Sequence, residues 1–310
     1  MADMYRNCKL NFLNEMFKKV LRNFYIKDYG ILLLFVIIYI IVFDSISGEL
    51  DTIINFLAKQ SIQKLMETNP KSVKESLIAS CAQILACYRK NCASPSSAGQ
   101  LILPECMKLL PLYTNCLLKS DALSGAADVG CDDRAFLMHS IGSMDVATTV
   151  AYFYPRLLPL HDLSPQDEDK VIIPHPLRCS IEKVTDDGVY ILENGIYMFF
   201  FVGLAVSPAW VNDVFGVQTA AQINVDKPTL EERDNPTSRQ VRAIVDLIRQ
   251  QRQRTYMKLV LVRQRDKLDI LFRHFLCEDR SAPGSGAGEL NFSYVDFLCH
   301  MHKEIRALLG

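Results

Sequence analysis

The sequence lacks the short motifs that most often mark an enzyme. No Gly-x-Ser-x-Gly, Gly-x-x-x-x-Gly-Lys-Ser/Thr or Gly-x-Gly-x-x-Gly string occurs among its 310 residues. A nucleophile elbow, a P-loop and a dinucleotide-binding turn are therefore not indicated. No other group of side chains assembles an active site, so we expect no enzymatic activity and no catalytic residue.

The chain also lacks an excess of charge of either sign, because its formal net charge is −1. One stretch is locally basic, and its arginines are at positions 239, 242, 249, 252, 254, 263 and 265. A solvated helix face is the simplest interpretation. An anionic membrane surface or an acidic partner is the next. Aromatic residues do not interleave with these arginines as a stacking platform would require, so no nucleic-acid partner is expected.

Ten cysteines are present, yet no Cys-x-x-Cys pair occurs. On a helix Cys81 and Cys87 would be about 240° apart, so they could not share a metal ion. His300 and His302 would likewise point in nearly opposite directions. We expect no metal ligands and no cofactor. The scattered spacing favours reduced thiols of a cytosolic protein over a disulfide framework.

A hydrophobic run long enough to span a membrane is missing. The most apolar stretch, ILLLFVIIYIIVF, lies within fifteen uncharged residues between Asp28 and Asp44. As a helix these would reach about 22 Å, whereas a bilayer core of ~30 Å needs ~20 residues. The basic residues Lys9, Lys18, Lys19, Arg22 and Lys27 precede the run and would keep the N-terminus cytosolic. The length and the flanking charges disfavour a membrane anchor over residues 29–43, and no cleavage site indicates a signal peptide.

Residues 49–150 show helical periodicity. Apolar side chains recur at helical spacing through residues 72–92, at Leu77, Cys81, Leu85, Tyr88 and Cys92. The pattern predicts helices at 51–60, 72–92, 104–118 (with a possible kink at Pro111) and from 132 onward, separated by loops at 94–99 and 125–130.

From residue 152 the pattern changes to short strands and turns. We expect strands at 179–184, 189–193, 196–202 and 257–262, and helices at 208–215, 238–250, 266–276 and 294–309. Asn194-Gly195 predicts a tight hairpin turn. Asp186-Asp187 and Glu193-Asn194 are interpreted as turn residues, in preference to calcium ligands. The strand IYMFFFV is apolar on both faces, which predicts cover on both sides.

Several long strings occur in a recognisable order. They are CAQILACYRKNCASPSSAGQLILPECMKLLP (81–111), FYPRLLPL (153–160), YILENGIYMFFFVG (190–203) and FSYVDFLCHMHKEIRALLG (292–310). Together they resemble the C-terminal part of the cargo-adaptor subunit of the COPII vesicle coat, with the C/D-type paralogues most similar. The resemblance covers nearly all of residues 49–310 and also residues 2–8.

The resemblance implies an α+β fold: an all-helical region, then a gelsolin-like α/β domain, then a C-terminal helix that returns to the helical region. The expected divisions are 1–8 (start of the helical region), 9–48 (an apolar insert), 49–150 (helical domain), 151–290 (gelsolin-like domain) and 291–310 (C-terminal helix). Gelsolin-like describes the fold only, so actin or calcium binding does not follow.

The function implied by the resemblance is a non-catalytic vesicle-coat adaptor in transport from the endoplasmic reticulum (ER) to the Golgi. The implied partners are the coat's GTPase-activating subunit, cytosolic export signals of cargo and fusion proteins, and the ER membrane surface. Localisation would be cytoplasmic, peripheral on ER exit sites and COPII vesicles. The family's zinc finger and most of its main partner interface precede the part seen here, so no zinc is expected in this chain.

The resemblance also implies a cargo-binding site at Leu101, Ile102, Leu103 and Pro104. In the C/D-type paralogues the matching region helps to take up Ile-x-Met-type signals of membrane fusion proteins. Aliphatic residues where a loop enters a helix can offer a shallow pocket and a strand edge to an extended peptide. The alternative is that Leu101 and Leu103 only pack the following helix onto the core.

Residues 9–48 have no counterpart in the family. Of these forty residues, twenty-two are Lys, Asn, Phe, Tyr or Ile, whose codons are rich in A and T. Cys8-Lys9 can be encoded with a splice-donor GTAAG, and Ser47-Gly48 with an acceptor-like CAG. Removing the nucleotides between them restores a cysteine codon directly before Glu49. The segment therefore resembles translated intron.

Two interpretations of different class remain from the sequence. One is a cytosolic coat-adaptor fragment with a spurious insert, and the other is a membrane-anchored variant that uses residues 29–43. An actin-binding gelsolin relative is a weaker third.

Overall fold

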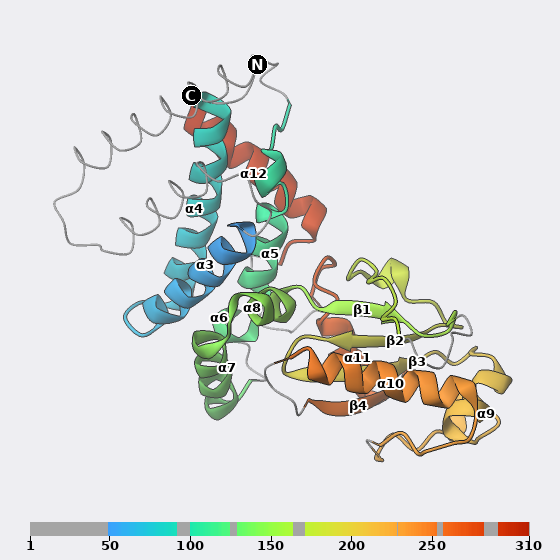
Figure 1. Cartoon of the computed structure of the whole chain (residues 1–310). Coiled ribbons are helices and arrows are strands. Elements are labelled where there is room, and N and C mark those ends of the chain that lie inside the picture. The colour runs from blue at the N-terminus through green and yellow to red at the C-terminus, as the bar shows by residue number, and fades with distance from the viewer. Residues whose placement is uncertain are drawn as a thin grey trace. The chain divides into compact units, whose positions relative to one another are not determined.

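The computed structural model describes residues 49–91, 100–124, 129–163, 171–227, 229–252, 257–281 and 291–309. The chain divides into two compact units, one of Met1–Val146 with Tyr294–Gly310 and the other of Ala147–Ser293 (Figure 1). The expected insert at 9–48 and its apolar stretch at 29–43 lie outside the described residues.

The first unit is helical. Its elements are α3 (Glu49–Leu65), α4 (Pro70–Asn91), the 3-10 helix η1 (Glu105–Met107), α5 (Leu110–Lys119), α6 (Asp121–Ser124), α7 (Cys131–Ser143) and α12 (Tyr294–Leu309). The C-terminal helix α12 packs against α4 and α5 (Figure 1). A segment nearly two hundred residues away in sequence thus completes the helical core, as the predicted fold class requires.

Helix α4 illustrates how local sequence builds this unit. Pro70 occupies the first helical position, where a missing N–H costs nothing. The side-chain oxygen of Asn69 accepts a hydrogen bond from the backbone N–H of Ser72 at 2.8 Å and so caps the helix. The predicted stripe is confirmed at Leu77, Cys81 and Leu85, which are buried, whereas Tyr88 is half-buried. Its last member, Cys92, lies outside the described residues.

The helix predicted over 104–118 is wrong in its first part. Residues 105–107 form a 3-10 turn, and α5 begins only at Leu110. Pro111 therefore lies in the first turn of α5 and does not kink it. The physical reason is that proline is accommodated in the first turn, where intrahelical N–H bonds are absent anyway.

The second unit contains a four-stranded sheet. Its elements are α8 (Val146–Phe153), β1 (Arg156–Pro159), η2 (Ile181–Lys183), β2 (Val189–Glu193), β3 (Tyr197–Val202), α9 (Pro208–Phe215), η3 (Ala220–Gln222), α10 (Pro236–Gln250), β4 (Lys258–Arg263) and α11 (Lys267–His274). The strand order is β1-β2-β3-β4, with antiparallel pairs β1–β2 and β2–β3 and a parallel pair β3–β4.

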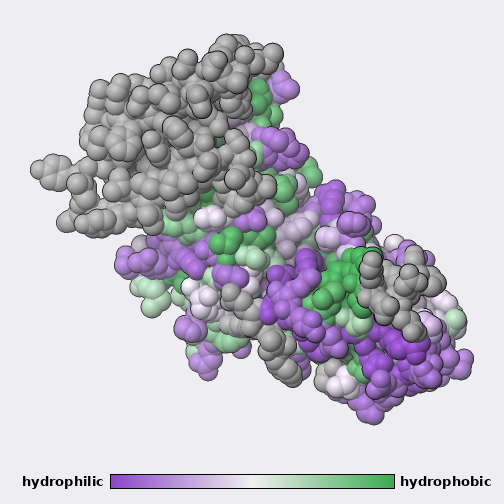
Figure 2. Space-filling model, viewed as in Figure 1, coloured by the Kyte–Doolittle hydropathy of each residue, from purple (hydrophilic) through white to green (hydrophobic). Residues whose placement is uncertain are grey.

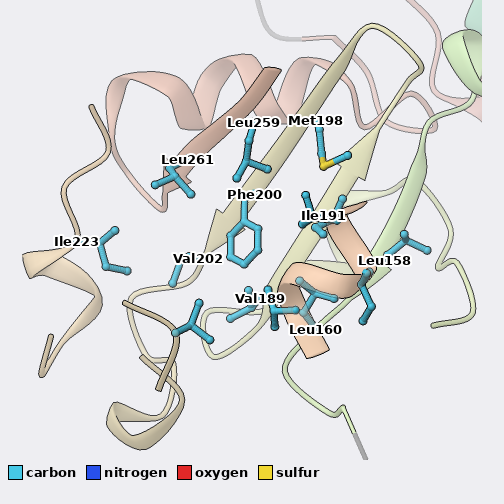
Figure 3. Packing of buried hydrophobic residues seen from close by; sticks show 14 of the residues in the cluster. Leu158, Leu160, Val189, Ile191, Met198, Phe200, Val202, Ile223, Leu259 and Leu261 are labelled. Atoms are coloured by element: carbon cyan, nitrogen blue, oxygen red, sulfur yellow. The ribbon is translucent and has the colours of Figure 1, made fainter. Parts of the chain in front are cut away.

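One face of this sheet packs against α9 and α10. Side chains on this face alternate along the strands, and the cluster they form includes Leu158, Ile191, Phe200 and Leu261 (Figure 3). Val241, Ile244, Val245 and Ile248 of α10 are all buried, as their spacing predicted. Alternate side chains of the strands and side chains at 3.6-residue spacing on the helix therefore pack together in one core.

The opposite face of the sheet is covered by α11. Phe201 of β3 stacks on Phe272 with ring centroids 4.6 Å apart, and Phe199 lies 5.2 Å from Phe275. Strand β3 is thus covered on both sides, which confirms the prediction from its continuous apolar run. Hydrophilic residues dominate much of the visible surface of this unit, and a hydrophobic area interrupts them on the right of the view (Figure 2).

The β2–β3 hairpin forms where Asn194-Gly195 predicted it, although its loop includes Ile196 and β3 begins at Tyr197. The side-chain oxygen of Asn194 accepts hydrogen bonds from the N–H groups of Ile196 and Tyr197, at 3.0 and 2.8 Å. Gly195 adopts φ +80°, a conformation that favours glycine. The amide side chain and the glycine together account for the tight turn.

The strand predicted at 179–184 is wrong. Residues 181–183 form η2 instead. The carboxylate of Asp279 accepts hydrogen bonds from the Ser180 hydroxyl at 3.1 Å and the Ile181 N–H at 2.6 Å. A side chain almost a hundred residues away thus satisfies the Ile181 N–H, a backbone group that a strand partner would otherwise bond. The overall α+β arrangement of helical region, sheet domain and returning C-terminal helix agrees with the predicted fold class.

Candidate functional site

The residues expected to bind cargo lie in a short extended connection that leads from α4 toward η1. Leu101, Ile102 and Leu103 are half-buried, and Pro104 is buried. Pro104 has φ −65° and ψ 141°, which is extended backbone. A residue that precedes a proline is itself restricted to extended conformations. The local sequence therefore favours an extended segment at 100–104, hereafter the cargo segment.

Each end of the cargo segment is held by a hydrogen bond. The Nη1 of Arg89, in the last turn of α4, donates to the Gln100 carbonyl oxygen at 2.7 Å. At the other end, the Met107 N–H donates to the Pro104 carbonyl oxygen at 3.0 Å. Met107 is buried, and η1 contacts α3. The segment is thus anchored to two helices of the same unit.

Leu101, Ile102 and Leu103 are aliphatic and partly exposed. Such side chains can contact apolar side chains of a peptide, but they carry no group that could act as an acid, a base or a nucleophile. Leu101 and Leu103 also contact the protein, since neither is fully exposed. Packing of the following helix and binding of a ligand are both compatible with this half-burial.

Leu109, five residues after the cargo segment, is an exposed leucine with which substitutions in the segment can be compared. Leu109 is 40% exposed, and Lys108 pairs with Glu105 at 2.9 Å on the exposed surface. Such exposed pairs contribute little to stability. Substitutions at Leu109 therefore serve as controls for the neighbouring segment.

Glu193, which we interpreted as a turn residue, has a further role. Its side chain is 0% exposed and bonds both Arg156 and Arg252, with Arg252 Nε donating at 3.1 Å. Two guanidinium groups compensate the buried carboxylate. The Gly195 N–H also donates to it, at 3.2 Å. Glu193 is thus an internal structural anion of the sheet unit.

A second buried carboxylate lies elsewhere in the sheet unit. Glu278 accepts hydrogen bonds from the Tyr154 hydroxyl at 2.6 Å and from Arg178 Nε at 3.0 Å. Burial and then the hydrogen bond to Glu278 raise the pKa of Tyr154, so the phenol stays protonated and remains a donor. The arrangement joins α8 to the chain after α11 and is structural.

The basic stretch is less solvated than its sequence suggested. Arg239, Arg242 and Arg249 pair with Asp234, Glu232 and Asp246, and Arg263 pairs with Asp266. Arg252 is nearly buried against Glu193. The interpretation as a simple solvated helix face is therefore too simple, because acidic neighbours neutralise much of the charge. Arg254 lies outside the described residues.

The described part of the chain holds no group of three or more His, Cys, Asp or Glu side chains placed to bind a metal ion. Burial raises the pKa of the Cys81 thiol to about 12, so this stripe cysteine stays protonated. Within the same residues, no helix combines the length and hydropathy needed to cross a bilayer.

Two protein families match the chain. The Sec23/Sec24 helical domain matches residues 49–151, and the gelsolin repeat matches residues 170–245. Residues 49–151 are thus similar to a Sec23/Sec24 helical domain. Leu101, Ile102, Leu103 and Pro104 lie within the part that this family matches.

Individual relatives agree with this assignment. Human "Protein transport protein Sec24C" is 51% identical over 262 residues, which are 84% of this chain and 23% of the relative. Human "Protein transport protein Sec24D" is 42% identical over 264 residues, 85% of this chain and 25% of the relative. The chain thus spans about a quarter of the length of these Sec24 proteins.

A solved structure is similar as well. The crystal structure of the human COPII-coat protein Sec24c superimposes with a TM-score of 0.76 at 48% identity, covering 84% of this chain and 32% of that one. The resemblance to C/D-type adaptors that the sequence strings indicated is confirmed over this share of the chain. The origin of residues 9–48 stays a prediction.

The sequence did not predict the hydrogen-bond partners of two arginines, one beside the cargo segment and one beside the buried Glu193. Arg89 and Arg252 each bond a group distant in sequence, at Gln100 and Glu193. The only sequence signal for Arg89 was its place in the last helical turn, where cations are favourable. That signal does not identify a partner.

Proposed function

We propose that the chain is part of a non-catalytic COPII cargo adaptor that contributes an export-signal site in transport from the ER to the Golgi. The observation that carries this is the Sec23/Sec24 helical domain with an anchored, extended aliphatic segment at residues 101–104. Support comes also from the names of the relatives, "protein transport protein" and "COPII-coat protein". No cofactor is required by this role.

The bound ligand would be a cytosolic peptide signal of the Ile-x-Met type carried by membrane fusion proteins. In an extended peptide, residues i and i+2 project to the same side. Such a signal could therefore place both apolar side chains against one apolar surface, such as that of Leu101 and Leu103.

A binding measurement tests this site. We expect a fluorescent peptide with one Ile-x-Met signal to bind the chain, and the double variant Leu101→Ser, Leu103→Ser to bind at least about tenfold more weakly, because two apolar contacts are lost. The matched control is Leu109→Ser, which lies outside the segment and should change affinity less than about twofold. Far-UV circular dichroism verifies that each variant folds. Equal binding by folded double variant and control would contradict the proposed site.

Further partners belong to the same proposal. The coat's GTPase-activating subunit would be contacted mostly through parts that the chain does not include, and the ER membrane surface would be contacted peripherally. Localisation would be cytoplasmic, on ER exit sites and COPII vesicles. Immunoprecipitation with tagged GTPase-activating subunit and imaging with an exit-site marker test these two statements separately.

Residues 9–48 would be translated intron and foreign to the adaptor. The Sec23/Sec24 helical domain match begins at residue 49, directly after the segment. Sequencing transcripts across codons 8–49 decides the matter: spliced transcripts should dominate. Abundant transcripts that retain the segment, together with its peptides in the protein, would refute the intron origin.

The membrane-anchored alternative makes a distinct prediction. A peripheral coat component is released from membranes by alkaline carbonate, whereas a chain anchored through residues 29–43 stays in the pellet. We expect release. Retention would favour the anchored variant.

A further inference from the structure

Lys74, in the second turn of α4, is a buried cation without a counter-ion. It is only 6% exposed, and it has no ion pair or side-chain hydrogen bond with any residue that the structure describes. Its Nζ is nevertheless not one of the fully buried polar atoms that lack a partner, so the ammonium reaches solvent through the small area that stays open. Burying a charge is costly when no partner replaces its hydration.

A second cation lies close to Lys74. Arg134, in the first turn of α7, donates from Nε to the Ala122 carbonyl oxygen at 3.2 Å. Ala122 belongs to α6, which contacts both α4 and α7. Burial and then the charge of Arg134 lower the pKa of Lys74. A neighbouring carboxylate would raise this pKa, and none in the described part of the chain does so.

Other cations with little exposure have an acid beside them. Arg252 pairs with the buried carboxylate of Glu193, and Arg242 pairs with Glu232. The two cations on α4 and α7 instead reinforce each other's positive charge. An apolar side chain in place of a buried, uncompensated charge is often more stable. An anion from outside the described residues would remove this electrostatic cost.

We propose that Lys74 and Arg134 form a binding site for the phosphate group of a small ligand. A phosphomonoester carries a charge of about −1.5 to −2 at neutral pH, which two cations balance. The Lys74 ammonium would act as a point charge, and the Nη groups of Arg134 would act as directed donors. This site is separate from the export-signal site proposed above and does not depend on it.

The small exposure of Lys74 limits what can bind. Only a compact group can approach an ammonium on a side chain that is 6% exposed. A single tetrahedral anion meets this requirement, whereas a broad polyanionic surface could not bring many charges to the same point. The Nε of Arg134 is already bonded to Ala122, so the orientation of the guanidinium is set before a ligand arrives. A preorganised donor loses less entropy on binding.

Thermal unfolding of the full chain tests the site. Saturating inorganic phosphate should raise the Tm by at least about 2 °C relative to chloride at matched ionic strength, because it binds the folded state only. Phosphate also stabilises many proteins by exclusion from their surfaces, so variants are needed. Lys74→Met should lose most of the rise, and Lys90→Met, on an exposed side chain of the same helix, should keep it. Equal rises in the two variants would overturn the site.

Trace acetylation locates the bound anion. A low concentration of acetic anhydride labels unprotonated lysines, and mass spectrometry reports each position. Saturating phosphate should slow labelling of Lys74 at least about threefold, since few sites remain free. Lys90 should change less than about twofold, because no binding site is proposed there. Unchanged labelling of Lys74 would overturn the proposal even if phosphate raised the Tm.

Calorimetric titration with inorganic phosphate separates the two cations. Lys74→Met should weaken binding at least about tenfold, and Arg134→Gln about fivefold, because each removes one charge-assisted contact. Arg134→Lys keeps the charge without the planar fork, so it should be weaker than the parent but tighter than Arg134→Gln. Circular dichroism verifies that each variant folds. Parent-like affinity in folded Arg134→Gln would exclude Arg134 from the site and overturn the proposal.

The choice of anion tests the ligand class. Acetate should bind at least about tenfold more weakly than phosphate, because it carries half the charge or less. Acetate binding as tight as that of phosphate would refute a phosphate site. Glycerol phosphate then distinguishes the sources: binding similar to that of inorganic phosphate supports a phosphate carried on a small molecule, and weaker binding supports the free ion.

Discussion

Two buried carboxylates of the sheet unit and two buried hydroxyls of the helical unit are satisfied in different ways. In the sheet unit, arginines from distant parts of the chain pair with the buried carboxylates of Glu193 and Glu278. In the helical unit, the buried hydroxyls of Ser61 and Thr114 donate to carbonyl oxygens four residues earlier in their own helices. The sheet unit thus relies on long-range charge pairs, whereas these helical groups are satisfied locally.

This difference indicates where each unit is vulnerable. A hydroxyl bonded within its helix can be removed at modest cost, because its acceptor keeps its helical partner. A buried carboxylate shared by two arginines cannot be removed without leaving buried positive charge. The four substitutions below, in order of decreasing expected effect, probe the two units: the first removes a buried charge pair, and the others test packing, a close backbone approach and a buried lysine.

Glu193→Gln should have the largest effect. We expect the free energy of unfolding of the sheet unit to fall by about 3–5 kcal/mol, since Arg156 and Arg252 would lose their compensating charge. Trp210, the only tryptophan of the chain, packs near Phe200 and Phe215 in this unit and reports its unfolding by fluorescence. Glu182→Gln, which removes an exposed partner of Arg178 at 3.8 Å, is the control. Similar losses of unfolding free energy in both variants would show that the buried carboxylate contributes no more than an exposed one.

Leu117→Ala tests the helical unit through packing alone. Leu117 on α5 is fully buried, so its truncation should cost about 2–5 kcal/mol. Urea unfolding followed by circular dichroism at 222 nm measures the loss. Leu109→Ala removes an exposed leucine just before α5 and should lie within about 0.5 kcal/mol of the parent. A small effect at Leu117 would mean that this core is not tightly packed.

Gly203→Ala probes a close backbone approach in the sheet unit. A Cβ at this position would lie 2.1 Å from the Asp186 carbonyl oxygen, which accepts a bond from the Ala205 N–H. We expect a loss of about 1–3 kcal/mol from the forced shift, measured by Trp210 fluorescence in urea. Gly142→Ala in α7 meets nothing within 4 Å and should instead be neutral or stabilising. A tolerated Gly203→Ala would indicate that this turn can move.

Lys74→Met should be the mildest change and should stabilise. Lys74 on α4 is only 6% exposed, and its burial, followed by the charge of Arg134, lowers its pKa. Removing an unfavourable charge typically gains about 0.5–2 kcal/mol.

The pH dependence of the Lys74 effect has a definite sign. With a pKa lower in the folded state, the unfolded state binds more protons between the two pKa values, so stability rises with pH there. The gain from Lys74→Met, measured by thermal melting, should therefore be full at neutral pH and shrink as pH rises toward the ordinary lysine pKa of about 10. A destabilising effect at neutral pH would show that the ammonium has a favourable partner.

Much of the fold was predictable, because its signals are local. The buried stripe of α10 and the Asn194-Gly195 turn follow from side-chain spacing and turn chemistry over a few residues. The strand expected at 179–184 failed because the carboxylate of Asp279, a residue remote in sequence, decides the local conformation. The helix start at Leu110 was misjudged because proline suits a first turn as well as a kink.

The cargo segment likewise has some features that the sequence predicts and one that it does not. Its residues were identified from a family resemblance, and Pro104 by itself predicts an extended chain. The bond from Arg89 was not predictable, because the ten intervening residues leave its partner undetermined.

The sequence by itself determined most of the stretches that become helix or strand, where the main hairpin turns, and the coat-adaptor resemblance, because periodicity and turn preference act over a few residues. Only the tertiary structure decided which arginine meets which carboxylate. Those outcomes depend on the spatial position of groups far apart in the chain, and such positions are set by packing of the whole unit.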